Sequence, residues 1–289
     1  MQLVTYLGQE TLFIIVAMVL FWCVDKRRGY YMMAVGFIGL AMNQILKLVF
    51  RIPRPWVRDP NFTVVESALP DANGYSFPSG HTQSASVVFG SLARWTERRW
   101  VRVASIAAML LVAFSRMYLG VHTPADVTVS LIIGVVLSFA LYPFFAKTDR
   151  DLMPLISALT IFAAVFVAVM QFYPFAVNAD AVYFDETAVN AYKMLGSVVA
   201  LAVSYPIEKK YIRFETNAPA PVQAVKLILG FSLTALIRGI LKAPLAAILP
   251  DGAAGFIRYF MVVFFAGLVW PLSFKHISAA YNRLSKKTS

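Results

Sequence analysis

Three short polar segments stand out in a chain that is otherwise almost entirely apolar, and their residue types suit the binding and transfer of phosphate. They read KLVFRIPRP, FPSGHT and SRMYLGVHTPAD in chain order. Two of the three histidines of the chain lie in these segments. The candidate site residues are Lys47, Arg54, Ser79, Gly80, His81, Arg116, His122 and Asp126.

The second segment predicts the start of a helix that can bind an anion. Ser79 is placed to cap this helix, with Gly80 and His81 in its first turn. Unpaired N–H groups and a partial positive charge at a helix N-terminus attract phosphate oxygens, and a glycine lets an anion approach the backbone closely. The alternative is a plain helix cap with an incidental histidine.

The third segment also predicts a helix start, in which Thr123 suits the N-cap, Pro124 the first position and Asp126 the third. This is a capping-box pattern with aspartate in place of glutamate, which by itself would explain Asp126. A compatible hypothesis is that Asp126 accepts a hydrogen bond from one nitrogen of His122 and leaves the other nitrogen free to attack phosphorus. The alternative for His122 is a polar residue at the membrane interface.

Lys47, Arg54 and Arg116 are the cations that we expect to hold phosphate oxygens. Phosphoryl transfer spreads charge over three oxygens, and three cations with a helix N-terminus can neutralise it without a metal. The alternative is that they anchor helix ends at the headgroups. The segments contain no acidic cluster for Mg²⁺, and the single cysteine, Cys23, excludes a Cys/His cluster, so neither metal nor cofactor is expected.

The composition is that of an integral membrane protein. Of the 289 residues, 59% are hydrophobic and 14% are charged, whereas soluble domains carry about 25% charged residues. The net charge of +11 would suggest a nucleic-acid partner in a soluble protein, but in a membrane protein basic residues usually set the topology, so none is expected. The N-terminus lacks the features of a cleaved signal peptide, so we expect the first span to be a signal anchor.

Runs of about 20 apolar residues, the length that crosses a bilayer, predict an all-α polytopic transmembrane helical bundle. The third run is short and rich in small residues, so we expect it in the interior of the bundle. The nine predicted spans are residues 7–24, 30–50, 80–95, 101–119, 124–146, 152–172, 189–207, 222–241 and 255–274.

The distribution of basic residues predicts the orientation of these spans. Alternate connections and the C-terminal tail hold 16 of the 26 lysines and arginines. The positive-inside rule then places the N-terminus outside, the C-terminus in the cytoplasm and all three polar segments on the outer side. We expect a bacterial cytoplasmic membrane. The proline-rich loop 51–78 either gates the entry of a lipid or simply connects two helices.

The motifs Lys-x6-Arg-Pro, Pro-Ser-Gly-His and Ser-Arg-x5-His-x3-Asp, in this order, resemble those of the type 2 phosphatidic acid phosphatase family of membrane lipid phosphatases. The resemblance implies a six-helix catalytic core over residues 1–172 and leaves residues 173–289 as an additional transmembrane region without an assigned role. It also implies metal-independent dephosphorylation through a phosphohistidine. His122 would be the nucleophile, His81 the proton donor and Asp126 the residue that orients His122. The matching positions are Lys47, Arg54, Pro55, Pro78, Ser79, Gly80, His81, Ser115, Arg116, His122 and Asp126.

The expected function is therefore that of a lipid phosphate or diphosphate phosphatase at the outer leaflet. Candidate substrates are phosphatidic acid, phosphatidylglycerophosphate, polyprenyl diphosphate and sphingoid phosphates. One alternative keeps the site and passes the phosphoryl group to another lipid. A further alternative is a transporter or a catalytically silent relative. The expected partners are the lipid substrate and the bilayer, while the oligomeric state is left open.

Overall fold

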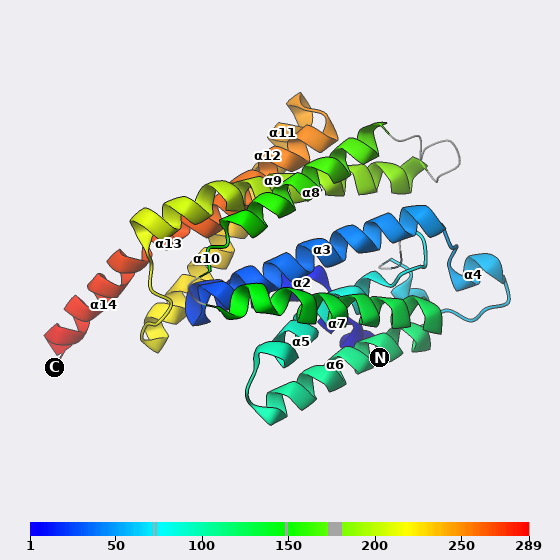
Figure 1. The fold of residues 1–289 in the computed structure, drawn as a ribbon, viewed down its shortest axis with the longest axis horizontal. Coiled ribbons are helices and arrows are strands. Elements are labelled where there is room, and N and C mark those ends of the chain that lie inside the picture. Colours follow the sequence, from blue (N-terminus) through cyan, green and yellow to red (C-terminus); the bar gives the residue numbers. More distant parts are fainter. Residues whose placement is uncertain (71, 73, 148–149, 173–180, 289) are drawn as a thin grey trace. The chain divides into compact units, whose positions relative to one another are not determined.

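The computed structural model describes residues 1–289 except for residues 71, 73, 148–149, 173–180 and 289. Regular structure in the described ranges is helical throughout, without strands, which confirms the predicted fold class (Figure 1). The chain forms two compact units. The first holds Met1–Met18, Arg27–Arg150 and residues 181–184, and the second holds Val19–Lys26, residues 151–172 and Asp185–Ser289.

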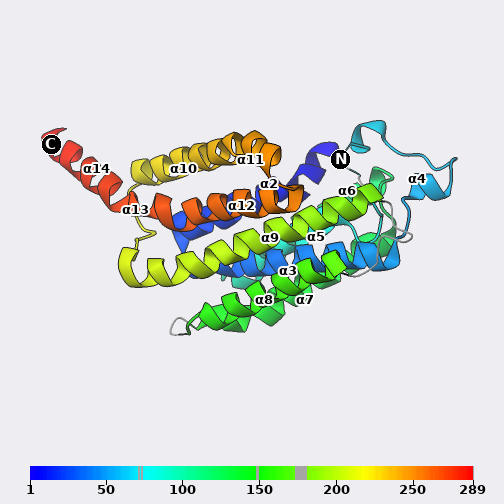
Figure 2. The same ribbon diagram turned by 90° about the horizontal axis from the view of Figure 1, so that it is seen from above.

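The helices of the first unit follow the predicted spans. In both ribbon views α3 and α7 run alongside one another, and the short helix α4 lies beyond the end of α3 (Figures 1 and 2). The elements are α1 (Gln2–Thr5), a 3₁₀ turn (Tyr6–Gly8), α2 (Glu10–Val19), α3 (Lys26–Phe50), α4 (Pro55–Arg58), a 3₁₀ turn (Glu66–Ala68), α5 (Gly80–Trp95), α6 (Arg99–Tyr118) and α7 (Pro124–Ala146).

Helix α5 lies in the interior of this unit, as its small residues predicted, and packs against α6 and α7. Small side chains allow close approach: a Cβ atom added to Gly134 of α7 would lie 2.1 Å from Ser86 Oγ of α5. The Ser86 hydroxyl donates a hydrogen bond to the carbonyl of Ser130 at 3.0 Å. The residues that α5 buries are Thr82, Gln83, Ala85, Ser86, Val87, Val88, Gly90 and Ser91.

By length and apolar composition, seven helices in the described ranges can cross a membrane, so the chain is a multi-pass integral membrane protein. An eighth is added if Gln2–Gly8 and Glu10–Val24, which meet at 52°, form one bent span. The remaining predicted span, 80–95, is α5, which has 16 residues. At about 1.5 Å per residue it is shorter than a hydrocarbon core of roughly 30 Å. Because protein covers much of α5, this helix does not need the full length of a lipid-facing span.

Aromatic and basic side chains close one end of the first unit. The buried Tyr31 hydroxyl donates to the carbonyl of Ser138 at 2.6 Å. The Tyr31 ring lies 5.1 Å from that of Trp95, centroid to centroid. The Arg94 guanidinium carbon lies 3.6 Å from the ring centroid of Tyr142. These contacts join α3, α5 and α7.

The second unit is organised around two tryptophans. The indole N–H of Trp22 donates to the carbonyl of Ala266 at 2.9 Å, and that of Trp270 donates to the carbonyl of Lys226 at 3.1 Å. Its helices are α8 (Met153–Phe172), α9 (Ala181–Ile207), α10 (Ala220–Ile240), α11 (Lys242–Ile248), α12 (Asp251–Phe264), α13 (Trp270–Leu272) and α14 (Phe274–Thr288), with π-helical turns at Leu20–Val24, Glu208–Ile212 and Phe265–Val269.

The second unit contains helices at the three predicted C-terminal spans, namely α9, α10 and α12. The boundary predicted between residues 172 and 173 adjoins residues 173–180, which lie outside the described residues. The division of the chain into two compact units is a property of packing and does not identify the residues that catalysis requires. The assignment of residues 1–172 as a catalytic core therefore stays a prediction.

The close approach of α5 and α7 gives a testable stability difference. We expect Gly134→Ala to destabilise the protein by about 1–3 kcal/mol, because the added methyl group would overlap Ser86, including its backbone carbon at 3.0 Å. Thermal unfolding of the detergent-solubilised protein measures this. The control is Gly239→Ala in α10, where no atom lies within 4 Å of the added carbon, and its melting temperature should be unchanged or slightly higher. Equal melting temperatures of the two variants would contradict the tight α5–α7 contact.

Candidate active site

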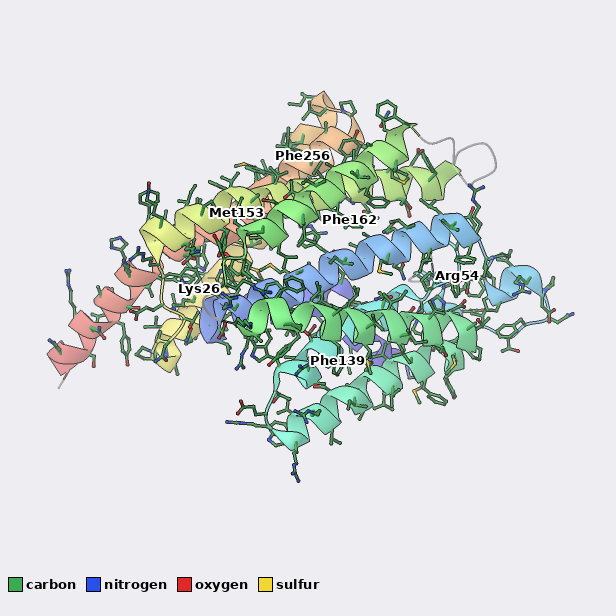
Figure 3. All side chains as sticks on the ribbon, in the orientation of Figure 1. Lys26, Arg54, Phe139, Met153, Phe162 and Phe256 are labelled. Atoms are coloured by element: carbon green, nitrogen blue, oxygen red, sulfur yellow. The ribbon has the colours of Figure 1, made fainter. Side chains whose placement is uncertain are left out.

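The three polar segments meet at one end of the first unit. Arg54 is the N-cap of α4, in the loop that leaves α3 (Figure 3). Ser79 caps α5, and His122 lies in the turn between α6 and α7. Asp126 is in the first turn of α7. The backbone N–H of Ser79 donates to the carbonyl of Asp126 at 3.2 Å, which joins the second segment to the third.

Asp126 is the most connected acidic group of the site. The predicted capping box is confirmed, since the Thr123 side chain accepts from the Asp126 backbone and the Asp126 side chain accepts from the Thr123 backbone. Oxygen Oδ2 of Asp126 accepts hydrogen bonds from Ser76 Oγ at 2.6 Å and from the Thr123 N–H at 2.7 Å. The same oxygen lies 3.4 Å from Nδ1 of His122. Asp126 therefore caps the helix and also faces the histidine, while its role in orienting His122 stays a prediction.

Arg54 approaches the other side of the imidazole. Its Nη1 lies 2.8 Å from Nε2 of His122 and 3.5 Å from Nδ1. On the opposite side of the ring, Nδ1 faces the Asp126 carboxylate, which can only accept, and this favours the tautomer in which Nδ1 carries the proton and Nε2 carries none. The two distances are similar, so Nη1 lies over the face of the ring and not on the in-plane extension of Nε2.

The environment of His122 favours the neutral imidazole. Burial lowers the pKa of His122 well below its usual range, and the hydrogen bond with Asp126 opposes this shift by a smaller amount. The positive charges of Arg54, Lys47 and Arg116 lower the pKa of His122 further. A neutral imidazole has a free lone pair, which is the form that a nucleophile requires.

The three cations are buried. The exposed fraction is 7% for Lys47, 5% for Arg54 and 0% for Arg116. Interfacial anchors extend toward water or headgroups, so this burial favours the site interpretation. Lys47 Nζ donates to the carbonyl of Tyr75 at 2.7 Å, and Arg116 Nη1 donates to Thr5 Oγ1 at 2.8 Å. Arg54 thus contacts the histidine directly, whereas the other two cations act on it through their charge.

The N-terminus of α5 has room beside it for a ligand. Ser79 caps the helix as predicted, and its Oγ accepts from the Thr82 N–H at 3.4 Å. Gly80 is exposed, and no atom lies within 4 Å of the place where a Cβ would be. In the following residue, His81, the ring atom Nε2 is buried and has no hydrogen-bond partner among the described residues. These features suit the binding of an anion at this helix end.

Sequence reasoning missed the contribution of the loop between the first two segments. The carbonyl of Gly74 accepts from Arg54 Nε at 3.0 Å, and the carbonyl of Tyr75 holds Lys47. Ser76 binds Asp126 through its side chain and the carbonyl of Ile52 through its N–H at 2.8 Å. The one sequence feature that could have identified these residues was their position immediately before the segment FPSGHT. Loop 51–78 is therefore part of the site, while its proposed gating of lipid entry stays a prediction.

The same loop packs on the turn that carries His122. Ala68 and Ala72 of the loop form a buried apolar cluster with Leu119 and Val121. At Gly120, which has a φ of +73°, an added Cβ would lie 2.5 Å from the carbonyl oxygen of Thr63. Only glycine combines this left-handed conformation with such a close approach. The packing connects the position of His122 to that of the loop.

Comparisons with known proteins agree with this site. Residues 27–150, which contain every candidate site residue, match the family described as the PAP2 superfamily. Residues 192–282 match the family described as PAP2 superfamily phosphatase, transmembrane extension. The chain belongs to the PAP2 superfamily. This confirms the resemblance inferred from the three motifs.

The relatives of this PAP2 superfamily member include named phosphatases. Undecaprenyl-diphosphatase BcrC of Bacillus subtilis is 33% identical over 42% of this chain and 59% of its own length. A probable sphingosine-1-phosphate phosphatase of Dictyostelium discoideum is 26% identical over 69% of this chain and 52% of its own. Phosphatidylglycerophosphatase B of Bacillus subtilis is 26% identical over 51% of this chain and 74% of its own length. The chain thus spans little more than half the length of the first two relatives. No solved structure matches it.

The contact between Ser76 and Asp126 yields a prediction for phosphate release. We expect Ser76→Ala to lower kcat about ten- to a hundredfold, because a hydrogen bond to a charged group contributes roughly 1.5–3 kcal/mol. The control is Ser91→Ala, which removes another buried hydroxyl whose partner is Ser138 Oγ at 3.5 Å. Steady-state kinetics should give a nearly unchanged kcat for the control. Similar losses in both variants would argue against a role of Ser76 through Asp126.

Proposed function

We propose that this PAP2 superfamily member is an integral membrane phosphatase that hydrolyses a lipid phosphate or diphosphate without a metal, through a phosphohistidine on His122. The observation that carries the proposal is the buried His122, whose Nδ1 faces Asp126 and whose Nε2 faces Arg54. An imidazole held in one tautomer, neutral and next to a guanidinium, has the properties of a nucleophile for an anionic phosphorus centre.

In the first step, Nε2 of His122 attacks phosphorus in line with the leaving oxygen. The N–P bond forms as the P–O bond to the lipid breaks, and the electron pair of that bond leaves with the oxygen. His81 donates a proton to this oxygen. Arg54 approaches the imidazole across its face, so the guanidinium and the phosphorus reach Nε2 from different directions. The positive charge that develops on His122 is stabilised by Asp126.

In the second step, water attacks the phosphohistidine. His81 accepts a proton from the water as the new P–O bond forms and the N–P bond breaks. The products are a lipid alcohol and inorganic phosphate, or a lipid monophosphate and inorganic phosphate when the substrate is a diphosphate. His122 recovers its lone pair and His81 its proton, so the cycle is balanced.

The cations and the N-terminus of α5 would hold the phosphate oxygens during both steps. Lys47, Arg54 and Arg116 carry three positive charges, which match an anion whose charge spreads over three oxygens. The backbone N–H groups of Gly80 and His81 add further donors. Arg54 would turn from the ring of His122 toward an oxygen when the phosphate enters.

The substrate would be a phosphate ester or diphosphate on a long apolar chain. The matched relatives are named for undecaprenyl diphosphate, sphingosine-1-phosphate and phosphatidylglycerophosphate, which share this chemistry. The distribution of lysine and arginine supports an active site on the extracytoplasmic side of the membrane, with the N-terminus outside and the C-terminus in the cytoplasm. The two Bacillus relatives support a bacterial cytoplasmic membrane.

The direct test is phosphate release by the full chain in detergent with EDTA, from phosphatidic acid, phosphatidylglycerophosphate, undecaprenyl diphosphate and sphingosine phosphate. We expect release that survives EDTA and falls at least about a thousandfold in His122→Asn, because the nucleophile is lost. The matched control is His276→Asn, which changes the exposed histidine of α14 and should leave the rate unchanged.

Two outcomes would contradict the proposal. Loss of activity in EDTA would overturn the metal-free mechanism, and retained activity in His122→Asn would overturn the phosphohistidine. If the wild type released no phosphate but transferred it to an added acceptor lipid, the phosphotransferase function would replace the hydrolase.

The roles of the two histidines also predict a bell-shaped dependence of kcat/KM on pH. His122 must be neutral and His81 protonated. Because the pKa of His122 is lowered from 6.5, His122 stays neutral as the pH falls through that value, and the acid limb should lie well below it. Burial and the positive charges of Arg116, Arg54 and Lys47 lower the pKa of His81 from 6.5 as well, so the alkaline limb should also lie below pH 6.5, where His81 loses its proton as the pH rises. Measurements between about pH 2 and about pH 8 should show both limbs.

The variant His81→Gln serves as the control for the assignment of the limbs, because it should remove the alkaline limb and leave the acid limb. A monotonic profile, or an acid limb centred at an ordinary histidine pKa, would argue against these roles.

A further inference from the structure

The segment Gln2–Gly8 is attached to the site at three places. Gln2 Nε2 donates to the carbonyl of Ser67 at 2.9 Å, and Ser67 Oγ donates to Gln2 Oε1 at 2.7 Å. Thr5 Oγ1 accepts from Arg116 Nη1 at 2.8 Å. A Cβ added to Gly8 would lie 2.5 Å from the carbonyl oxygen of His81. The segment therefore contacts the loop, a phosphate-site cation and the first turn of α5.

A bend in the chain allows this placement. The segment Gln2–Gly8 meets the following helical stretch Glu10–Val24 at 52°. The sequence alone predicted a span over residues 7–24. Because of the bend, a residue that precedes the first predicted span reaches Arg116, which lies 111 positions further along the chain.

Thr5 and Arg116 are both enclosed, with exposed fractions of 2% and 0%. A hydrogen bond to a charged group is stronger in a low-dielectric interior than in water. The guanidinium is planar and its N–H donors have fixed relative directions. An acceptor that holds Nη1 in place therefore also restricts the directions of the other N–H groups.

We propose that Thr5 is a positioning residue for Arg116 and that Gln2–Gly8 forms one wall of the phosphate site. The Thr5 hydroxyl oxygen accepts from Nη1 and holds the guanidinium plane in the orientation in which it binds a phosphate oxygen. This inference rests on the proposed phosphate-binding function of Arg116. Thr5 itself needs no contact with the phosphate.

The alternative is that Thr5 is a buried polar residue that only contributes to folding. The positioning role and the purely structural role of Thr5 predict different effects when Thr5 is substituted. A positioning residue affects phosphate affinity and kcat without a comparable loss of stability, and its effect requires Arg116. A purely structural residue lowers the melting temperature, and its effect is independent of Arg116.

The test uses Thr5→Val, which keeps the shape and removes the acceptor, and Thr5→Ser, which keeps the hydroxyl. We expect Thr5→Val to lower kcat/KM about ten- to a hundredfold and to weaken inhibition by inorganic phosphate, and Thr5→Ser to restore most of both. The matched control is Thr234→Val in α10, whose hydroxyl donates to the carbonyl of Gly230 at 2.7 Å, and it should resemble the wild type.

A double-mutant cycle with Arg116→Lys tests whether Thr5 acts through Arg116. We expect the loss in Thr5→Val/Arg116→Lys to be close to that in Arg116→Lys alone. Multiplicative losses would overturn the proposal. A kcat/KM of Thr5→Val equal to that of the wild type, or one that Thr5→Ser does not restore, would also overturn it.

A second readout does not depend on turnover. Inorganic phosphate should raise the melting temperature of the wild type and of Thr5→Ser, and should raise that of Thr5→Val much less. An equal increase in all three would overturn the role of Thr5 while leaving the proposed function intact. If the wild type neither released phosphate from any lipid nor was stabilised by phosphate, the proposed function would fail, and the role of Thr5 with it.

Discussion

The site depends on one buried carboxylate. Asp126 has an exposed fraction of 1%, and a buried charge is costly unless it is hydrogen-bonded or paired. Its Oδ2 receives the Ser76 hydroxyl and the Thr123 N–H and faces Nδ1 of His122. These three partners come from the loop before α5, from the cap of α7 and from the turn after α6. Satisfying one carboxylate therefore brings together the elements that build the site.

All three cations donate hydrogen bonds to neutral oxygens. Lys47 donates to a backbone carbonyl, Arg54 donates to the carbonyls of Gly74 and Val121, and Arg116 donates to a hydroxyl. A neutral acceptor satisfies a hydrogen bond without cancelling the positive charge, whereas a carboxylate would do both. Together these charges create a positive potential that suits an anion, and they add to the effect of burial, which is the larger cause of the lowered pKa of His122.

The two compact units correspond to the two family matches. The PAP2 superfamily match ends at residue 150, where the main stretch of the first unit also ends. The match to the transmembrane extension lies within the second unit. That unit has its own core of tryptophans and other aromatic rings, such as Phe21 against Phe214 at 5.4 Å. Each unit therefore has its own source of stability, and the described site contacts lie within the first.

The sequence by itself determined the membrane class, the positions of the helices and the caps at Ser79 and Thr123. These features are local: a run of apolar residues, or a side chain three positions from a backbone N–H, is visible in a short window. Each of the three motifs also lies within a short stretch of sequence, and for this reason the motifs identified the candidate residues and the family.

Only the tertiary structure decided which other residues surround the candidate site residues and which hydrogen bonds hold the site residues in place. Ser76 meets Asp126 across 50 positions, Arg54 meets His122 across 68, and Thr5 meets Arg116 across 111. No periodicity or spacing encodes such pairs, because they arise from the packing of α5, α6 and α7 and from the bend after Gly8. The length of α5 has the same origin, since a helix covered by other helices is not required to match the thickness of the bilayer.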